Sequence, residues 1–587
     1  MIKILSISIF ILMAVIPFLE TLSRILSFNN ITASQVIVQH LTLWIGFVGA
    51  IIASNQNKLL SLNRSLLFNE EKQISFITFI PKLVSFLVFI ALAYGSWELI
   101  KVEYQYPINI APFIPRWLAQ SIMPVGFLLM AINILFNSYS NFKHQLLFVV
   151  ITFILFFSPV IEIFSNILPI MPIAVLLILF SLLMGAPIVV GLGGLSIFFF
   201  WYDFTPIAAI PTEAYRIVVS PTLPTIPLFT LAGYILAESK ASERLVKVFR
   251  NVFGWIPGGT PIIIILLCGF FTALTGGSGV TILALGGLLL PMLKKEGYNS
   301  SFSIGLITVS GSLGLLFPPS LPAIIYGVTA GVSVKDIFIG GIIPGSLLII
   351  LLSIWSIRNR SITKLKATKF NFKYSLMSIW ETKWELMIPV IILIGVFGGY
   401  STIVETASLT LIYVFVIEFF IYKDIELENL FKIIIQCSCL IGGVLIILGV
   451  AMGLTSYLVD AQVPMAILNW VKVSINSKYT FLFLLNIFLL IVGCLMDIFS
   501  AIIVIVPLIT PLGIYFGIDP VHLAIIFIAN LELGFLTPPV GMNLFLSAYR
   551  FEKEMSEIYR ATLPFFLVKL FAVALITYIP FLTIYFL

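Results

Sequence analysis

The chain has 587 residues, of which 60% are hydrophobic and only 10% are charged, and its net charge at neutral pH is +6. Soluble globular proteins do not have this composition, so the sequence predicts a polytopic membrane protein. The phosphate-binding pattern GxxxxGK[ST] is absent from the sequence, which excludes ATP hydrolysis by that route. The four cysteines lie in or beside apolar segments and form neither a disulfide framework nor a spaced set of metal ligands.

Apolar segments near the length of about 20 residues that a bilayer crossing needs follow one another from the N-terminus. No small-x-small cleavage site follows the first of them, so we expect a retained span rather than a signal peptide. The first predicted spans lie at 4–19, 35–54, 78–98, 118–136, 146–164, 168–184, 187–202 and 224–238. The basic residues of the connecting loops place the N-terminus in the cytoplasm.

Two charged segments further along the chain support that orientation. The segment ESKASERLVKVFR, residues 238–250, is predicted to form an interfacial helix on the cytoplasmic side. The loop at 357–385 is also predicted to be cytoplasmic, because six basic residues precede any acid. They are Arg358, Arg360, Lys364, Lys366, Lys369 and Lys373.

The second half of the chain contains an internal duplication. The segment LGLLFPPS at 313–320 reappears as LGFLTPPV at 533–540. Pro291 and Pro511 are related by the same offset in numbering, so each lies equally far before its double proline. A repeated pair of prolines with a third proline in register indicates two related structural units.

Each predicted unit begins with a long apolar segment, at 261–290 and 479–510, that is too long for one simple span and is broken near its middle. We expect a re-entrant hairpin there, followed by a span that the double proline breaks. Charge places the base of the first hairpin in the cytoplasm, beside Lys294 and Lys295, and the second opens outside, so the units are inverted. Proline frees backbone carbonyls, which sodium binds, although prolines can also merely kink packed helices.

These segments resemble a known family. The motifs GGSGVTILALGGLLLP, GSLGLLFPPSLPAIIYG, MDIFSAIIVIVPLITP and LELGFLTPPVGMNLF, together with PTIPLFTLAG and GWIPGG, are similar to the large membrane subunit of tripartite ATP-independent periplasmic (TRAP) transporters. The segment 1–140, with LTLWIGFVGAIIASNQNKLLSLN, resembles the family's small four-helix subunit, but Lys58 stands near where the family usually has a histidine. The predicted domains are therefore 1–140, a connecting transmembrane helix within 141–167, and a large-subunit-like domain at 168–587.

The resemblance implies an all-α elevator-type transporter with about 15 transmembrane spans plus two re-entrant hairpins in an inverted repeat. It implies uptake across the bacterial inner membrane, driven by Na⁺ at two sites and not by ATP. The substrate would be an organic acid, such as sialic acid, another sugar acid or a C4-dicarboxylate, delivered by a periplasmic substrate-binding protein. No motif reads the substrate, so its identity stays open.

Candidate site residues follow from the motifs and from the preference of sodium for several oxygen ligands. The first sodium site would use Gly277, Ser278, Gly311, Ser312, Gly314, Phe317 and Pro318, and the second Asp497, Gly534, Thr537, Pro538 and Gly541. Ser320, Asn543 and Ser278 are the candidates for substrate binding. Alternatively, Asp497 is satisfied by the backbone or by Ser500, and the small polar residues only join helices. For Glu532 both readings stay open.

Two other functions are compatible with parts of the sequence. GGSG at 276–279 fits the GxSG pattern of intramembrane serine proteases, with Ser278 as nucleophile and His522 as its only plausible partner, but a protease gives no reason for duplicated broken helices. An ion-coupled elevator carrier that works without a binding protein is the other alternative. We expect a transporter and not an enzyme.

Overall fold

The computed structural model describes residues 2–27, 33–59, 75–111, 114–138, 170–255, 259–358, 372–475, 477–538 and 541–587. Most of these residues are helical, and the strands among them are β1 (Asn109–Ala111) and β2 (Ile114–Pro115), which pair antiparallel. Nine of the described helices are long and apolar enough to cross a bilayer, and one bent pair would make a tenth. The predicted connecting helix within 141–167 lies outside the described residues, so the total of about 15 spans stays a prediction.

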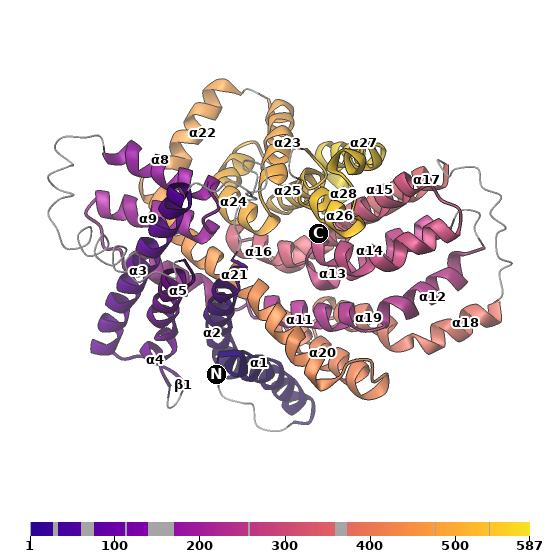
Figure 1. Cartoon of the computed structure of the whole chain (residues 1–587), viewed down its shortest axis with the longest axis horizontal. Coiled ribbons are helices and arrows are strands. Elements are labelled where there is room, and N and C mark those ends of the chain that lie inside the picture. Colours follow the sequence, from indigo (N-terminus) through magenta and orange to yellow (C-terminus); the bar gives the residue numbers. More distant parts are fainter. Residues whose placement is uncertain are drawn as a thin grey trace. The chain divides into compact units, whose positions relative to one another are not determined.

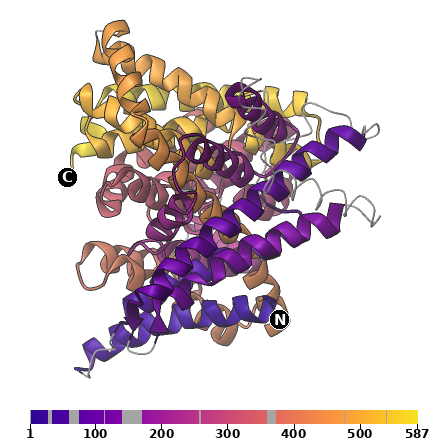
Figure 2. The same cartoon turned by 90° about the vertical axis from the view of Figure 1, so that its left-hand side faces the viewer.

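The chain forms two compact units. The first comprises Met1–Ile16, Phe28–Leu223 and Ile434–Met465. Its helices are α2 (Ser34–Asn55), α3 (Ser75–Gln105), α4 (Arg116–Gln120), α5 (Ile122–Ser138), α8 (Ile170–Leu183), α9 (Ile188–Tyr202) and α10 (Ala209–Val218), shown in indigo to purple in Figure 2. Helices α1 (Ile2–Ile25), α21 (Leu427–Asp460) and α22 (Val463–Ser474) contribute to both units.

Helix α3 is longer than the predicted span at 78–98. It continues to Gln105 through WELIKVEYQ, where the apolar run has already ended. Leucine, glutamate and lysine are good helix formers, so the helix persists where hydropathy alone predicts an end. Helix α1 likewise continues past the predicted span at 4–19, whereas the other predicted spans of this unit that the structure describes agree with helix boundaries to within a few residues.

Glycines bring α2 and α21 into backbone contact within the first unit. A Cβ atom built on Gly49 would lie 2.1 Å from the carbonyl oxygen of Ser438, and one on Gly442 would lie 2.1 Å from the backbone nitrogen of Ala50. Small residues allow helices to approach this closely, and van der Waals packing is what holds helices together in lipid. The two glycines therefore fix this crossing.

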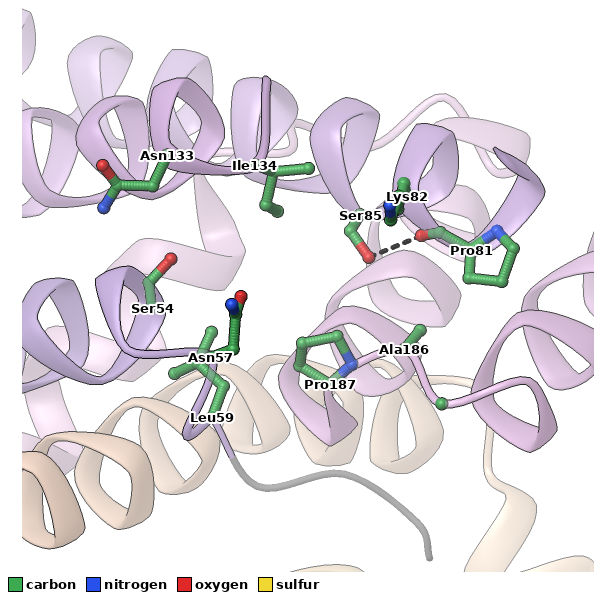
Figure 3. A pocket seen from close by; sticks show the side chains of 11 residues that line it. Ser54, Asn57, Leu59, Pro81, Lys82, Ser85, Asn133, Ile134, Ala186 and Pro187 are labelled. Atoms are coloured by element: carbon green, nitrogen blue, oxygen red, sulfur yellow. Dashed lines mark hydrogen bonds between the residues drawn. The ribbon is translucent and has the colours of Figure 1, made fainter. Parts of the chain in front are cut away.

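A cavity of about 330 Å³ lies where several helix ends of the first unit meet (Figure 3). Its lining comes from the end of α2, the start of α3, the end of α5 and the turn before α9. The lining residues are Ser54, Asn57, Leu59, Pro81, Lys82, Ser85, Asn133, Ile134, Gly185, Ala186 and Pro187. Helices α2 and α5 end at this cavity and α3 starts there. Helix α3 therefore runs in the opposite direction to α2 and α5, as the predicted order of spans requires.

The second unit comprises Pro17–Ser27, Pro224–Ile433 and Ala466–Leu587. Its first helices are α11 (Thr225–Glu238), α12 (Ala241–Phe253), α13 (Thr260–Thr275), α14 (Ser278–Lys295), α15 (Ser300–Ser310), the 3-10 turn η2 (Leu313–Leu316), α16 (Leu321–Ala330) and α17 (Val334–Arg358). Then come α18 (Phe372–Glu381), α19 (Lys383–Phe397), α20 (Ile403–Phe415) and the π-helical turn η3 (Val416–Ile421). The last are α23 (Lys478–Leu495), α24 (Ile498–Tyr515), α25 (Pro520–Gly534), α26 (Met542–Phe551), α27 (Met555–Tyr578) and α28 (Phe581–Ile584).

Both predicted breaks in the long apolar segments are present. Helix α13 gives way to α14 at Gly276 and Gly277, and α23 gives way to α24 at Met496 and Asp497. Figure 1 shows α13 and α14 side by side. The bounds of α14 and α24 are equivalent positions of the sequence repeat at both ends. The duplication therefore extends to the positions of helix boundaries.

Helices of each repeat pack against helices of the other repeat. Helix α16 of the first repeat packs on α24 of the second, and α26 of the second packs on α14 of the first. In the same way α15 packs on α27 and α25 packs on α17. Helices α14 to α17 of the first repeat thus pack against α24 to α27 of the second, which makes one body of the duplicated region.

Helix α12 is the predicted charged helix, but one of its charges, Arg244, is largely buried. The Arg244 guanidinium binds Glu385 on α19, Glu418 on η3 at 3.0 Å and Asp424 at 2.5 Å. It also lies 3.8 Å from the centre of the Tyr422 ring. Burial lowers the pKa of Arg244, but its hydrogen bonds to Asp424 and Glu385 outweigh that effect and raise the pKa above its ordinary value. Arg244 thus holds α12 to three later segments.

Replacing Arg244 by Met should strongly destabilise the protein. The side chains of Glu385 and Glu418 are fully buried, so they would lose their cation in a medium that cannot solvate them. We expect the free energy of unfolding in detergent to fall by about 3–5 kcal/mol. Lys247→Met on the same helix is the control, because its pair with Glu381 is exposed and should contribute less than about 1 kcal/mol. Equal losses in the two variants would contradict this assignment.

Candidate functional site

The first helix break is shaped by two glycines. Gly276 has φ +68°, a conformation that side chains disfavour, and a Cβ atom there would lie 2.5 Å from Cβ of Leu321. Gly277 is extended and directly precedes α14. The tip of the first break therefore packs against the start of α16.

The double proline of the first repeat lies in an interrupted helix, as predicted. Helix α15 and the turn η2 are followed by Phe317, Pro318 and Pro319 in non-helical geometry, and α16 starts after a bend of 44°. A cis peptide bond joins the two prolines. The Ser320 hydroxyl donates to the Leu315 carbonyl and accepts from the Ala323 backbone nitrogen, so it caps α16 and is used locally.

The structure brings the first break and this interrupted helix together. A Cβ atom on Gly311 would lie 3.5 Å from the carbonyl oxygen of Ser278, and the Thr272 hydroxyl donates to the Gly311 carbonyl at 2.7 Å. Thr272 also bonds the Thr281 hydroxyl at 2.7 Å. Sequence reasoning predicted the contact between Ser278 and Gly311 but missed the two threonines, whose spacing on either side of the break was the available signal.

Other predicted residues of the first sodium site have evident packing roles. A Cβ atom on Gly314 would lie 2.2 Å from the Gly269 carbonyl, so only glycine allows η2 to lie on α13. The Gly314 carbonyl accepts from the Phe317 backbone nitrogen at 3.0 Å, and the Phe317 ring packs against Gly345 on α17. The Ser312 hydroxyl accepts from Lys569 at 2.9 Å.

Asp497 occupies the second break and caps α24. Its carboxylate accepts from the backbone nitrogens of Phe499 and Ser500, each at 3.0 Å, and from the Ser500 hydroxyl at 2.6 Å. This is the structural alternative that the sequence left open, in which the carboxylate satisfies backbone donors that a helix start leaves without intrahelical partners. Gly277 stands at the equivalent position of the first repeat, so the second break alone carries a charge.

The loop after α25 returns to the second break. Gly534 packs on Gly493 of α23, because a Cβ atom added to Gly534 would lie 2.6 Å from Cα of Gly493. The backbone nitrogen of Gly541 donates to the Cys494 carbonyl at 3.2 Å, which places both ends of this loop beside the end of α23. The Thr537 hydroxyl donates to the Leu533 carbonyl at 3.1 Å. Pro538 is described, whereas 539 and 540 lie outside the described residues.

A hydrogen bond joins the two repeats at the candidate substrate site. The Ser278 hydroxyl, at the start of α14, donates to Oδ1 of Asn543, at the start of α26, at 2.7 Å. Both side chains are buried, and the Asn543 amide nitrogen has no hydrogen-bond partner among the described residues. Two of the three predicted substrate residues are thus brought together, whereas Ser320 is not part of the pair.

Sequence reasoning missed Lys569. It lies on α27 within the apolar run FFLVKLFAVAL, and its ammonium binds Glu532 and Ser312, each at 2.9 Å. A lysine inside a predicted span is rare and was the signal that could have identified it. Glu532 is therefore one half of a buried ion pair.

The protease alternative has no support in this geometry. Ser278 bonds Asn543, whereas the His522 ring bonds the Thr583 hydroxyl at 2.7 Å and the Thr577 carbonyl at 3.3 Å. In the part of the chain that the structure describes, no group of three or more His, Cys, Asp or Glu side chains could hold a metal ion. The polar groups at the breaks are mainly hydroxyl, amide and backbone oxygens with one carboxylate, which is the ligand chemistry of a hard cation.

Two family models match the chain. The tripartite ATP-independent periplasmic transporter, DctM component, matches residues 173–582, and the DctQ component matches residues 13–144. The isethionate TRAP transporter permease protein DctMQ of Oleidesulfovibrio alaskensis is 28% identical over 571 residues, covering 94% of this chain and 88% of that protein. It is similar across both matched regions.

Other relatives are large permease proteins. The C4-dicarboxylate TRAP transporter large permease protein DctM of Pseudomonas aeruginosa is 33% identical over 360 residues, covering 61% of this chain and 84% of that protein. Among solved structures, the YdaH transporter of Alcanivorax borkumensis is 13% identical with a TM-score of 0.47, covering 64% of this chain and 88% of that one, a likeness too low to carry an argument.

The matched components and the relatives are transporter permeases, and these proteins are not enzymes. The family match also explains the order of the chain, in which a small-subunit region precedes a large-subunit region. The chain belongs to the tripartite ATP-independent periplasmic (TRAP) transporter family, as a permease that fuses the small and large membrane subunits.

Proposed function

We propose that this permease takes up an organic acid across the inner membrane by sodium-coupled secondary active transport, with the substrate delivered by a periplasmic substrate-binding protein. The family supports solute uptake and a binding-protein partner. The observation that carries the proposal is the Ser278–Asn543 hydrogen bond, which joins the broken helices of both repeats at one buried place. Discontinuous helices that meet in this way are how secondary transporters form their binding sites.

Sodium coupling is supported by the ligands near each break. The first break offers the Ser278 hydroxyl and the carbonyls around Gly311, and the second offers Asp497 and the carbonyls between Gly534 and Gly541. These residues would hold two sodium ions, although several of their oxygens already accept internal hydrogen bonds. Sodium would supply the driving force, since the sequence has no phosphate-binding loop.

The substrate proposal rests on chemistry at the junction of the repeats. The Asn543 amide nitrogen is a buried donor with no partner among the described residues, and a carboxylate is a matching acceptor. The names of relatives mention isethionate and C4-dicarboxylate, which are small organic anions. Sialic acid and other sugar acids also carry a carboxylate, so the preference for a C4-dicarboxylate or similar small acid comes from the names of these relatives.

We also propose that the repeats are inverted in the membrane, with the N-terminus in the cytoplasm, and that they move together as an elevator. The mutual packing of α14 with α26 and of α16 with α24 supports movement as one body. A carrier of the same architecture that works without a binding protein is the alternative, and uptake measurements separate the two.

Uptake into proteoliposomes tests the function directly. With a cognate binding protein outside and an inward sodium gradient, a labelled organic acid should accumulate without ATP. Replacing sodium by choline should abolish accumulation, because the driving ion is then missing. Omitting the binding protein should also reduce uptake to background. Equal uptake in choline would contradict sodium coupling, and full uptake without the binding protein would favour the alternative carrier.

Asp497→Asn separates a sodium ligand from a helix cap. Asparagine caps helices as well as aspartate, so the stability of α24 should be kept while the charge is lost. Loss of a charged ligand should raise the half-saturating sodium concentration about tenfold to hundredfold. Asp519→Asn is the matched control, because Asp519 caps α25 through Val521 and His522 and should affect sodium dependence little. An unchanged sodium curve for Asp497→Asn, with normal membrane levels, would show that Asp497 is only a cap.

Asn543→Ala tests the substrate contact. The substitution removes the unpartnered amide and leaves the Ser278 hydroxyl without its acceptor, so the KM for transport should rise about tenfold or more. Asn469→Ala on α22 is the control, since that side chain is exposed. A KM for Asn543→Ala equal to that of the wild type would remove Asn543 from the substrate site.

A further inference from the structure

Lys569 makes a buried network that reaches Ser312 of the predicted first sodium site but is not itself a sodium or substrate ligand in the proposed function. Its side chain and that of Glu532 are both fully buried, and their charged atoms lie 2.9 Å apart. The same ammonium donates to the Ser312 hydroxyl at 2.9 Å. One cation therefore contacts the proline-interrupted segment of each repeat, through Ser312 after α15 and through Glu532 within α25.

The two contacts have the same place in the repeat. Ser312 and Glu532 are equivalent positions of the duplication, since each stands directly before the matching LGLLFPPS or LGFLTPPV segment. The glycine of each segment, Gly314 or Gly534, packs on its own hairpin. Gly314 lies against Ala273 and Gly534 against Gly493, and these two partners are again equivalent positions. Lys569 thus binds equivalent positions of the two repeats, one in the turn after α15 and one near the end of α25.

The network is poorly explained by stability alone. A buried ion pair often stabilises a fold no better than apolar residues of the same size, because both charges lose their hydration. The second carboxylate oxygen of Glu532 has no partner among the described residues, so the pair is not fully satisfied. The arrangement does supply directional bonds, because an ammonium bound to two acceptors fixes the positions of the two segments that carry them.

We propose that Lys569 is a positioning residue that sets the relative geometry of the two predicted sodium sites, so that sodium binding at one site raises the sodium affinity of the other. The inference rests on the proposed sodium coupling. Ser312 directly follows Gly311 of the first site, and Glu532 precedes Gly534 of the second, so a shift of either turn displaces its neighbour through the shared ammonium. Sodium binding should then be cooperative.

The test compares three forms of the full-length protein. Lys569→Met/Glu532→Gln removes both charges together, so it leaves no uncompensated ion in the core. Lys553→Met/Glu557→Gln is the control, because that pair lies near the start of α27 at 3.0 Å with exposed side chains. Two properties are measured against sodium concentration for each form: uptake into proteoliposomes, and the melting temperature of the purified protein in detergent.

We expect the Lys569→Met/Glu532→Gln variant to insert and to melt near the wild-type temperature without sodium. Its half-saturating sodium concentration should rise about tenfold, and the Hill coefficient should fall to about 1, because the link between the turns is lost. The sodium-dependent rise in melting temperature should shift to the same higher concentrations. The control pair should change none of these. If this double variant does not insert, Lys569→Met/Glu532→Met, which replaces the buried pair by apolar side chains of similar size, takes its place and should show the same loss of cooperativity.

Wild-type sodium curves with an unchanged Hill coefficient in the double variant, or in Lys569→Met/Glu532→Met where that is used, would overturn the inference and leave the proposed function intact. A wild-type protein whose uptake and melting temperature both ignore sodium would overturn the proposed function itself. The two failures are therefore told apart by the wild-type measurement.

Discussion

Inside a bilayer the backbone has no water to bind, so each interruption of a helix must be covered by protein. The second unit meets this constraint shortly before each double proline by packing backbone on backbone. Gly314 lies on α13, and Gly534 lies on Gly493 of α23. Hydrogen bonds complete the cover, from Thr272 to the Gly311 carbonyl and from the Gly541 nitrogen to Cys494. Without these contacts the non-helical carbonyls that a cation could bind would not persist.

The duplication keeps this framework while the chemistry differs between the copies. Helix boundaries and glycine contacts repeat at the same offset, but a glycine at 277 corresponds to an aspartate at 497, and a serine at 312 corresponds to a glutamate at 532. The candidate substrate residue Asn543 likewise corresponds to Ala323. The packing positions are thus shared, and the polar side chains that could discriminate between ligands belong to one repeat or the other.

Much of the fold could be predicted because its signals are local. The breaks at 276–277 and 496–497, the interrupted helix at the first double proline and the charged helix α12 all follow from glycine, proline and charge within short windows. The partners of Arg244 and Lys569 could not be predicted, because they lie on helices distant in the sequence. For Asp497 the local pattern allowed both a cap and a ligand, and the structure shows the cap while the ligand role stays a prediction.

The difference between Gly277 and Asp497 has an electrical consequence under the proposed coupling. Lys569 and Glu532 neutralise each other, so Asp497 would be the one net charge contributed by the residues discussed at the breaks. Two sodium ions and a monovalent acid would then bring the loaded site to zero, two sodium ions and a C4-dicarboxylate would leave it at about −1, and the empty site returns with a charge of about −1. The membrane potential would act on the return of the empty carrier, at roughly 2.3 kcal/mol per charge for each 100 mV. An interior-negative membrane would thus accelerate the reset step rather than the translocation of substrate.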